Sequence, residues 1–228
     1  TYSKGTKIKE TTFDSAGNPQ QESHFGDNVK TIVTRWFEGG APQSREEFVN
    51  DRLMKGEYYT AGHHIEARID NGQGTRLVRD IYGQLLSTDQ FENGQMISTT
   101  NYHPNGNPKE IALYKNGLAH GERKSFLPAG EPEFIEQWRG GIQEGVSLTF
   151  KNGERYAEVP YSQGKKNGVE KHYRDQDTVI EEIAWLDDQL HGPSVTYVDG
   201  KVVKTEWYYQ GRPVPKISYD LKTGQRRL

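Results

Sequence analysis

Short segments in which apolar and polar residues alternate recur along the whole chain. In VSLTF, residues 146–150, Val146 and Leu148 fall on one side of an extended chain, and Ser147 and Thr149 fall on the other. Alternation at every second position predicts a β-strand with one apolar face and one polar face. Turn signals such as NG, GG and PNG separate these segments at intervals of roughly a dozen residues, so the sequence predicts antiparallel hairpins rather than helices.

These segments belong to an internal repeat that is most regular from residue 91 to 211. Each unit opens with an aromatic residue, and successive openings lie 20 to 24 residues apart. The opening residues are Phe13, Phe37, Tyr59, Tyr82, Tyr102, Phe126, Phe150, Tyr173, Tyr197 and Tyr219. A second series of large side chains lies three positions before the next turn and comprises Phe48, Ile69, Phe91, Tyr114, Trp138, Tyr161, Trp185 and Tyr208. The repeat predicts an all-β fold, an elongated antiparallel β-meander of about nine to ten hairpins that forms one array over residues 1–228.

Two stretches before residue 91 depart from the repeat. In residues 42–56, Ser44 and Glu47 imitate a helix capping box, but the repeat phase passes through Phe48 unbroken and favours strands. The glycine spacing also changes in residues 51–56 and 72–74, so the sequence leaves the register of these outer repeats open.

The composition limits both the core and the partners. Only 32% of the 228 residues are hydrophobic while 11% are aromatic, so we expect a thin sheet whose core consists of a few rings per unit. The net charge of -3 is spread along the chain without a basic stripe, which argues against nucleic acid as a partner. The absence of cysteine excludes disulfides and thiol catalysis. No apolar run approaches the ~20 residues of a membrane span, so none is expected.

The first residue is Thr1, which suggests a processed precursor or a trimmed chain. A lipid anchor upstream of Thr1 is compatible with the sequence, and a location outside the cytoplasm, in the periplasm or on the cell surface, is slightly favoured.

Several units resemble a known repeat family. The segments YHPNGNPK, LYKNGLAHG, FKNGERYAEVPYSQGKKNG and WLDDQLHGPSVTY share an aromatic residue with a Gly turn, an aromatic-x-x-Gly, and a short segment that ends in Gly. This pattern is similar to the MORN-repeat variant, which occurs in tandem in bacterial proteins that are often described as YwqK-type antitoxins. The resemblance implies a twisted antiparallel β-meander with a non-catalytic interaction role.

The residues offer no catalytic or metal site. Adjacent carboxylates at 181–182 and 187–188 would diverge on a strand or lie in a turn, and no nucleophile elbow, phosphate loop or HExxH motif is present. His120 and His191 hold equivalent repeat positions three units apart, so they are not expected to share a metal. We therefore predict that the chain is not an enzyme and needs no cofactor.

The large side chains of the second series are the candidate binding residues. In the regular repeats these are Tyr114, Trp138, Tyr161, Trp185 and Tyr208. They would also form the core of a thin sheet, with Gly121, Gly145, Gly168 and Gly192 either at turns or beneath a neighbouring ring. We expect the rings on one face and Arg123, Ser125, Ser147, Thr149, Glu170, His172, Ser194 and Thr196 on an opposite, solvated face. A partner would then bind the rings, the polar face or a terminal strand edge.

Three functions fit these observations. The first is a scaffold that binds a partner protein. The second is a bacterial surface or periplasmic protein that binds glycan or another small ligand through the aromatic ladder, because the cluster WYY at 207–209 resembles those of choline-binding repeats. The third is an antitoxin-like protein that neutralises a partner toxin.

Overall fold

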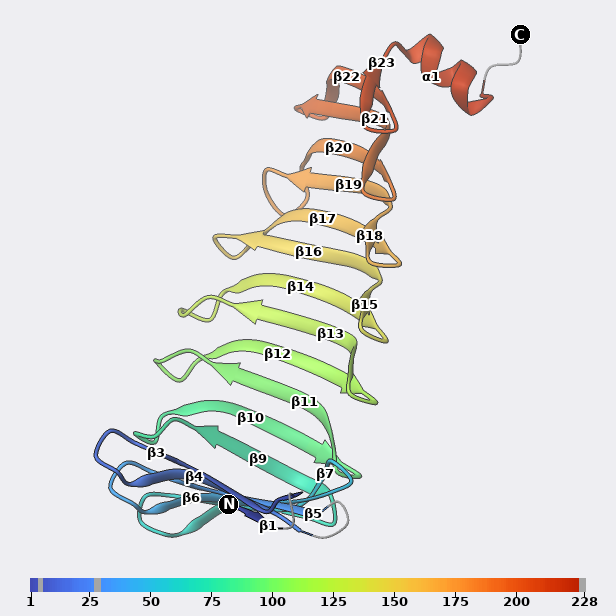
Figure 1. The fold of residues 1–228 in the computed structure, drawn as a ribbon. Helices are drawn as coiled ribbons and strands as arrows, with labels where there is room; N and C mark the ends of the chain where they lie inside the picture. Colours follow the sequence, from blue (N-terminus) through green and yellow to red (C-terminus); the bar gives the residue numbers. More distant parts are fainter. Residues whose placement is uncertain (4–5, 27–29, 226–228) are drawn as a thin grey trace. The chain divides into compact units, whose positions relative to one another are not determined.

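The computed structural model describes residues 1–3, 6–26 and 30–225 (Figure 1). The chain divides into two compact units, residues 1–118 and 119–228, which are described separately. Among the described residues, no helix is long and apolar enough to cross a membrane.

The first unit is an antiparallel meander of hairpins, in which each strand from β3 to β11 pairs with the strand that follows it. Its strands are β1 (Tyr2–Ser3), β2 (Thr6–Lys7), β3 (Lys9–Phe13), β4 (Pro19–Phe25), β5 (Lys30–Trp36), β6 (Pro42–Val49), β7 (Arg52–Tyr59), β8 (Ile65–Asp70), β9 (Gln73–Arg79), β10 (Leu85–Glu92), β11 (Gln95–Tyr102) and β12 (Pro108–Lys115). β1 and β2 pair with each other in a separate small sheet.

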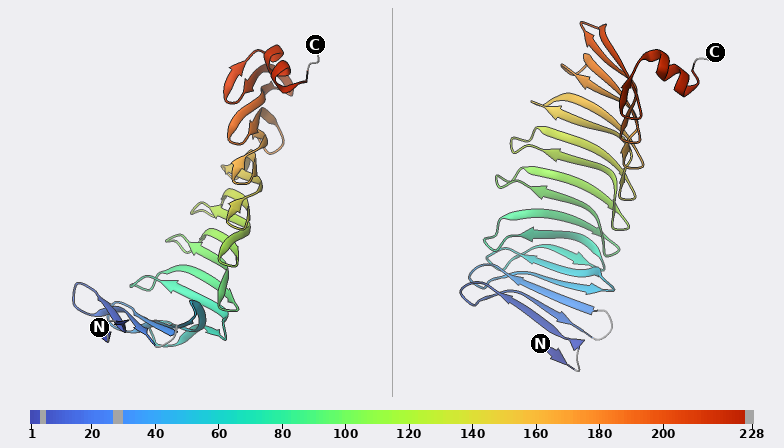
Figure 2. Two further views of the ribbon diagram at one scale, coloured as in Figure 1. Left: turned by 45° about the vertical axis from the view of Figure 1, so that its right-hand side comes forward. Right: turned by 45° about the horizontal axis from the view of Figure 1, so that its top comes forward.

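The second unit continues the same motif and ends in a helix. Its elements are β13 (Leu118–Phe126), which begins at the last residue of the first unit, β14 (Pro132–Arg139), β15 (Ile142–Gln143), β16 (Gly145–Lys151), β17 (Glu154–Ser162), β18 (Lys165–Lys166), β19 (Gly168–Tyr173), β20 (Val179–Leu186), β21 (Gln189–Val198), β22 (Lys201–Tyr209), β23 (Arg212–Val214) and α1 (Lys216–Thr223). Its hairpins follow one another in sequence order in both views of Figure 2. The predicted all-β meander is confirmed, while the single array over the whole chain and its elongation stay predictions.

The residues that open the repeats lie beside β-bulges. The register shifts at Phe13, Trp36, Tyr59, Tyr102, Phe126, Phe150, Tyr173 and Tyr197. A bulge bends and twists a strand where pairing ends, which explains its recurrence at one repeat position. Phe37 and Tyr82 do not hold this bulge position, because Phe37 follows the bulged Trp36 and Tyr82 lies in an exposed turn.

Residues 42–56 are strand, as the repeat phase predicted. β6 and β7 form a hairpin whose turn residues, Asn50 and Asp51, both have positive φ, which Asn and Asp tolerate best after Gly. The prediction that Tyr219 opens a further repeat unit was wrong, because residues 216–223 form α1.

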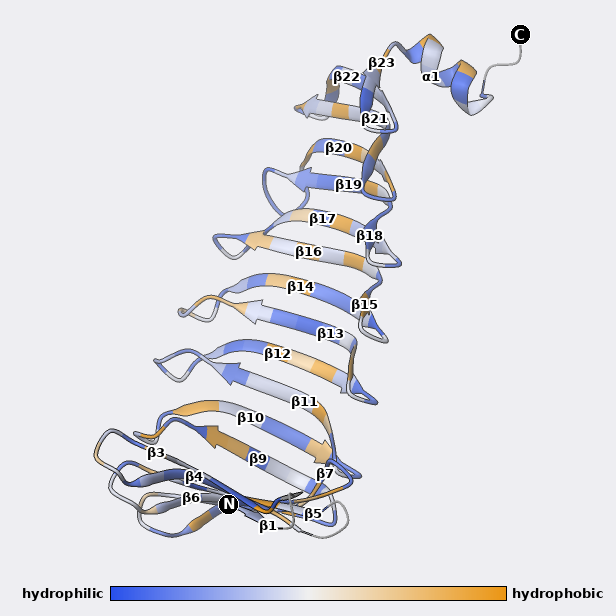
Figure 3. Cartoon of the chain, viewed as in Figure 1, coloured by the Kyte–Doolittle hydropathy of each residue, from blue (hydrophilic) through white to orange (hydrophobic). Residues whose placement is uncertain are grey.

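The predicted separation of an apolar ring face from an opposite polar face was also wrong. Gly145 lies opposite Tyr161, and Ser147 is two residues from Gly145 on the same strand, so the serine and the ring share a face. Ser147 is 8% exposed, whereas Val146 on the other face is 47% exposed. Hydrophobic and hydrophilic residues accordingly mix along single strands (Figure 3). We call the face that carries the second-unit rings the ring face.

The core of the first unit is small and lies beside a polar network. Leu53, Tyr58 and Ile69 are almost fully buried, and Phe48, Ala67, Leu77 and Phe91 pack against them. Glu46 is 1% exposed and binds Nη1 of Arg35 at 2.6 Å, while the Tyr58 hydroxyl donates to it at 3.0 Å. Burial, with the nearby charge of Glu46, raises the pKa of the Tyr58 hydroxyl.

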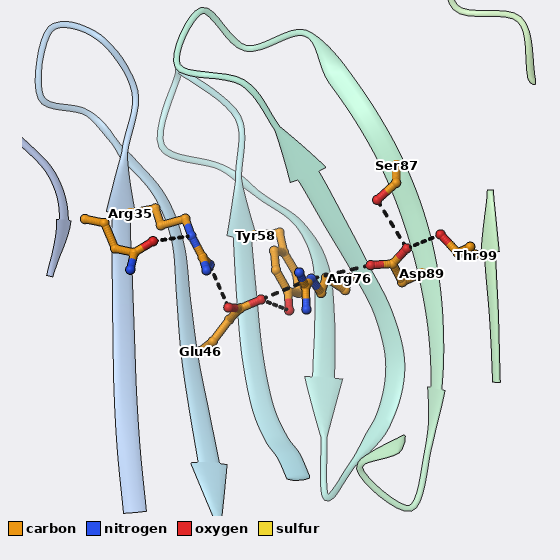
Figure 4. Close-up of polar contacts among 8 residues, drawn as sticks. Arg35, Glu46, Tyr58, Arg76, Ser87, Asp89 and Thr99 are labelled. Carbon is orange, nitrogen blue, oxygen red and sulfur yellow. Dashed lines mark hydrogen bonds and ion pairs between the residues drawn. The ribbon is translucent and has the colours of Figure 1, made fainter. Parts of the chain in front are cut away.

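Arg76 extends this network to the next strands (Figure 4). Its Nε lies 3.5 Å from both Glu46 and Asp89, and Asp89 accepts hydrogen bonds from Thr99 at 2.5 Å and Ser87 at 3.2 Å. Paired, hydrogen-bonded carboxylates can be buried, so polar side chains occupy core positions in this thin sheet.

Candidate functional site

Each large side chain of the second series in the second unit lies opposite a glycine of the neighbouring strand. The pairs are Gly121 with Trp138, Gly145 with Tyr161, Gly168 with Trp185 and Gly192 with Tyr208. All four rings are partly buried. The glycine removes the cross-strand side chain that would otherwise occupy the space beside the ring. All four glycines have positive φ, as expected for the predicted backbone bend.

The glycines also bend the chain. Gly168 has φ 119° and Gly192 has φ 115°, a conformation that L side chains rarely adopt. A Cβ built on Gly168 would lie 3.0 Å from Cγ of Pro160, and one on Gly192 would lie 2.8 Å from Cβ of Ala184. Backbone conformation and close packing therefore both require glycine here.

Polar side chains lie beside the rings on the same face, two residues away along each strand. They follow the register pairs Arg123 with Glu136, Glu170 with Ile183, and Ser194 with Glu206. The indole Nε1 of Trp138 donates to Glu136 at 2.9 Å, whereas the buried Nε1 of Trp185 has no hydrogen-bond partner among the described residues. The ring face therefore carries both aromatic and polar side chains. Of its two tryptophans, Trp185 is the one whose indole N–H lacks a hydrogen-bond acceptor among the described residues.

A charged cluster adjoins Trp185. The Nζ of Lys166 lies 4.5 Å from the centre of the Trp185 ring, within the range of a cation–π interaction, and 2.8 Å from Glu170. His172 lies between two carboxylates, with Nε2 2.6 Å from Glu170 and Nδ1 3.2 Å from Glu181. Burial of Glu170 tends to raise its pKa, but the hydrogen bonds from Lys166 and His172 outweigh burial and lower it. Sequence reasoning named Glu170 and His172 only as solvated side chains and missed Lys166, because pairing across strands depends on register.

The remaining predicted residue, Tyr114, lies on β12 of the first unit. Ser98 pairs with Leu113, which places Ile97 rather than a glycine near Tyr114. Tyr114 is partly buried.

Two other members of the second series in the first unit do lie opposite a glycine, whereas Phe48 lies opposite Thr31. Gly56 lies opposite Ile69, and Gly74 lies opposite Phe91. These pairs settle the register that the sequence left open before residue 91.

Residues 98–116 match the family model of the MORN repeat variant. The matched segment runs from Ser98, within β11, through β12 and contains Tyr102 and Tyr114. The resemblance seen in the sequence is thus confirmed, whereas the antitoxin description is not. A search of curated proteins found no match.

Solved structures with partial similarity include two of TcdB2-TccC3. The form without the hypervariable C-terminal region is 12% identical with a TM-score of 0.23, and the match covers 87% of this chain and 13% of that chain. A second structure, of TcdB2-TccC3, is 11% identical with a TM-score of 0.20, and the match covers 93% of this chain and 16% of that chain. This chain corresponds to a small part of the length of either structure.

Proposed function

We propose that the chain is a non-catalytic binding module whose partner is a protein that docks on the ring face of the second unit. The observation that supports this function is the series of four partly exposed rings, Trp138, Tyr161, Trp185 and Tyr208, each beside a glycine. Aromatic side chains supply most of the binding energy at protein interfaces, and repeat arrays commonly present such surfaces.

The composition of the ring face favours a protein over a glycan as partner. Charged groups such as Lys166, Glu170 and Arg123 lie between the rings, so the face offers anchors and ion-pairing groups together. This combination matches the aromatic and arginine-rich centres of protein interfaces. The glycan-binding and antitoxin-like functions remain alternatives that the same experiment tests.

Two substitutions on β16 distinguish binding to the ring face from binding to the opposite face. Thr149 is exposed and lies on the ring face opposite Phe134 and Ala157, whereas Val146 is exposed on the other face. Thr149→Arg adds a long charged side chain beside the rings without removing a core residue, and Val146→Arg is its matched control.

The partner would first be identified by crosslinking and mass spectrometry and then purified. We expect Thr149→Arg to weaken binding at least tenfold by calorimetry and Val146→Arg to bind as wild type, with circular dichroism confirming that both fold. Loss of binding only in Val146→Arg would move the site to the opposite face. Capture of a carbohydrate but no protein in a glycan array would instead support the surface-protein alternative.

A further inference from the structure

The last full strand of the second unit has an open edge. β22 pairs with β21 along its length, but β23 covers only Trp207 to Tyr209. Along the other edge, residues 201–206 pair with no strand among the described residues, and all six side chains are exposed. Val202 and Val203 are each 58% exposed. An exposed edge with apolar side chains is a template for an additional strand.

The edge is open because a proline replaces a bending glycine. Where β14 meets β15, Trp138 pairs with Gln143, and two residues later Gly145 turns the chain back onto the sheet with φ 98°. At the end of the array Tyr208 pairs with Pro213, and two residues later stands Pro215, with φ -60°. The proline ring fixes φ near this value, so it cannot adopt the positive φ of the glycine. The chain therefore leaves the sheet and forms α1.

The position of the missing strand follows from the repeat. β16 returns to β14 with Thr149 opposite Phe134 and Leu148 opposite Ile135. A shift of 70 residues relates Trp138 to Tyr208, and it relates Phe134 and Ile135 to Lys204 and Thr205. A further strand would therefore pair with Lys204 and Thr205.

The structure has a groove at this position. A cavity of about 580 Å³ is lined by residues that include Thr205, Trp207, Pro213 and Pro215. Trp207 pairs with β23, so the alternation of an antiparallel ladder directs the backbone N–H and C=O of Thr205 outward, away from β21. The groove thus combines free backbone groups with apolar side chains and with the charged side chains of Glu206 and Lys216.

We propose that this edge, residues 201–206 with the adjoining groove, binds an extended segment of a partner protein as an added β-strand. The preceding repeat indicates the chemistry of that segment. Glu206 corresponds to Glu136, beside which β16 places Ser147, and Lys204 corresponds to Phe134, opposite Thr149. At every second position, the partner segment therefore carries a side chain that bears a hydroxyl or is complementary to Glu206 or Lys204, and this side chain points to the ring face. The positions between carry apolar side chains, which point to the opposite face.

A second copy of this chain fits the edge less well. Its first repeat strand, β3, has Phe13 at the bulge position that Phe150 holds in β16, so Glu10 takes the place of Ser147. Glu10 would then lie beside Glu206, and like charges across strands are destabilising. A partner segment with a hydroxyl at this position avoids the repulsion.

The test uses a labelled synthetic peptide, IQEGVSLTFK, which is the sequence of residues 142–151. Binding to the whole chain is measured by fluorescence anisotropy. Thr205→Pro removes the outward N–H without removing a hydrogen bond to β21, and Thr205→Val keeps it as the matched control. We expect Thr205→Val to bind as wild type and Thr205→Pro to bind at least tenfold more weakly. A peptide with Ser147→Glu should also bind more weakly.

This edge is distinct from the ring face, and one variant separates the two proposals. Thr149→Arg, which blocks the ring face, should bind the peptide as wild type does. Equal binding to wild type and Thr205→Pro, or no binding to wild type, would overturn the inference. Self-association by light scattering that Thr205→Pro abolishes would identify a second copy as the occupant and overturn the assignment to a partner segment.

Discussion

At the scale of single residues, the glycines opposite the rings have two separate roles that substitution can distinguish. Gly192 combines φ 115° with a close approach to Ala184, whereas Gly200 has φ 73° and no neighbour within 4 Å of a built Cβ. Strain from the backbone therefore acts at both positions, and steric overlap acts only at Gly192.

Gly192→Ala should accordingly destabilise the protein more than Gly200→Ala does. Strained backbone conformations cost on the order of 1–3 kcal/mol, so we expect Gly200→Ala near the lower end and Gly192→Ala at or above the upper end. Urea unfolding monitored by circular dichroism measures both. Equal losses would show that the contact with Ala184 relaxes without cost.

The pairing of Glu170 predicts a pH dependence. Its folded-state pKa lies below the ordinary value of 4.5, because the hydrogen bonds from Lys166 and His172 outweigh burial. A lowered carboxyl pKa stabilises the fold above the unfolded-state pKa, and this stabilisation is lost as the pH falls through the folded-state pKa. Glu170→Gln should therefore lower the melting temperature at pH 7, and the difference from wild type should shrink below pH 4.5. If the difference in melting temperature stays constant with pH, the ion pairs of Glu170 contribute nothing to stability.

At the scale of elements, α1 packs on rings at the end of the second unit and leaves residues 201–206 of β22 uncovered. Tyr219 is 7% exposed and packs 4.9 Å from the Trp207 ring and 5.6 Å from the His191 ring, measured between centroids. Repeat arrays need such terminal caps because the last repeat has no successor to cover its apolar side chains.

Tyr219→Ala should loosen this end. Truncation of a buried aromatic side chain costs about 3–5 kcal/mol, and here the loss should fall on α1, β22 and β23. Hydrogen exchange should show faster amides in these elements, while Ile217→Ala, at an exposed helix position, serves as the control. Unchanged exchange in β22 would show that the helix does not cap the sheet.

At the scale of the whole molecule, pairing joins strands that are near one another in the chain, so a local defect should stay local. The buried Glu46 network offers the test. Glu46→Ala leaves Arg35 and Arg76 without their shared carboxylate, and breaking a buried pair costs roughly 3–5 kcal/mol.

We expect Glu46→Ala to speed hydrogen exchange in β5 to β10 and to leave β16 to β22 unchanged. Glu66→Ala is the control, because Glu66 pairs with Arg79 at an exposed position and should cost about 1 kcal/mol or less. Faster exchange throughout the chain would show that the two units unfold together.

The sequence by itself determined the hairpin repeat, its period of about 23 residues and the strand assignment of residues 42–56, because alternation, turn residues and spacing are local signals. It also singled out Gly121, Gly145, Gly168 and Gly192, each of which lies opposite a large side chain of the second series. The MORN repeat variant was recognisable from the same motifs.

Only the tertiary structure decided which side chains share a face. The sequence placed Ser147 opposite the rings, but the cross-strand register places it among them, since the facing of one strand relative to the next depends on pairing rather than on either strand alone. For the same reason, the sequence alone did not reveal the Glu46 network or the cluster around Glu170. The change from strand to helix after Pro215 was readable only once the positive φ of the equivalent glycines was known, because the proline matters through the bend it prevents.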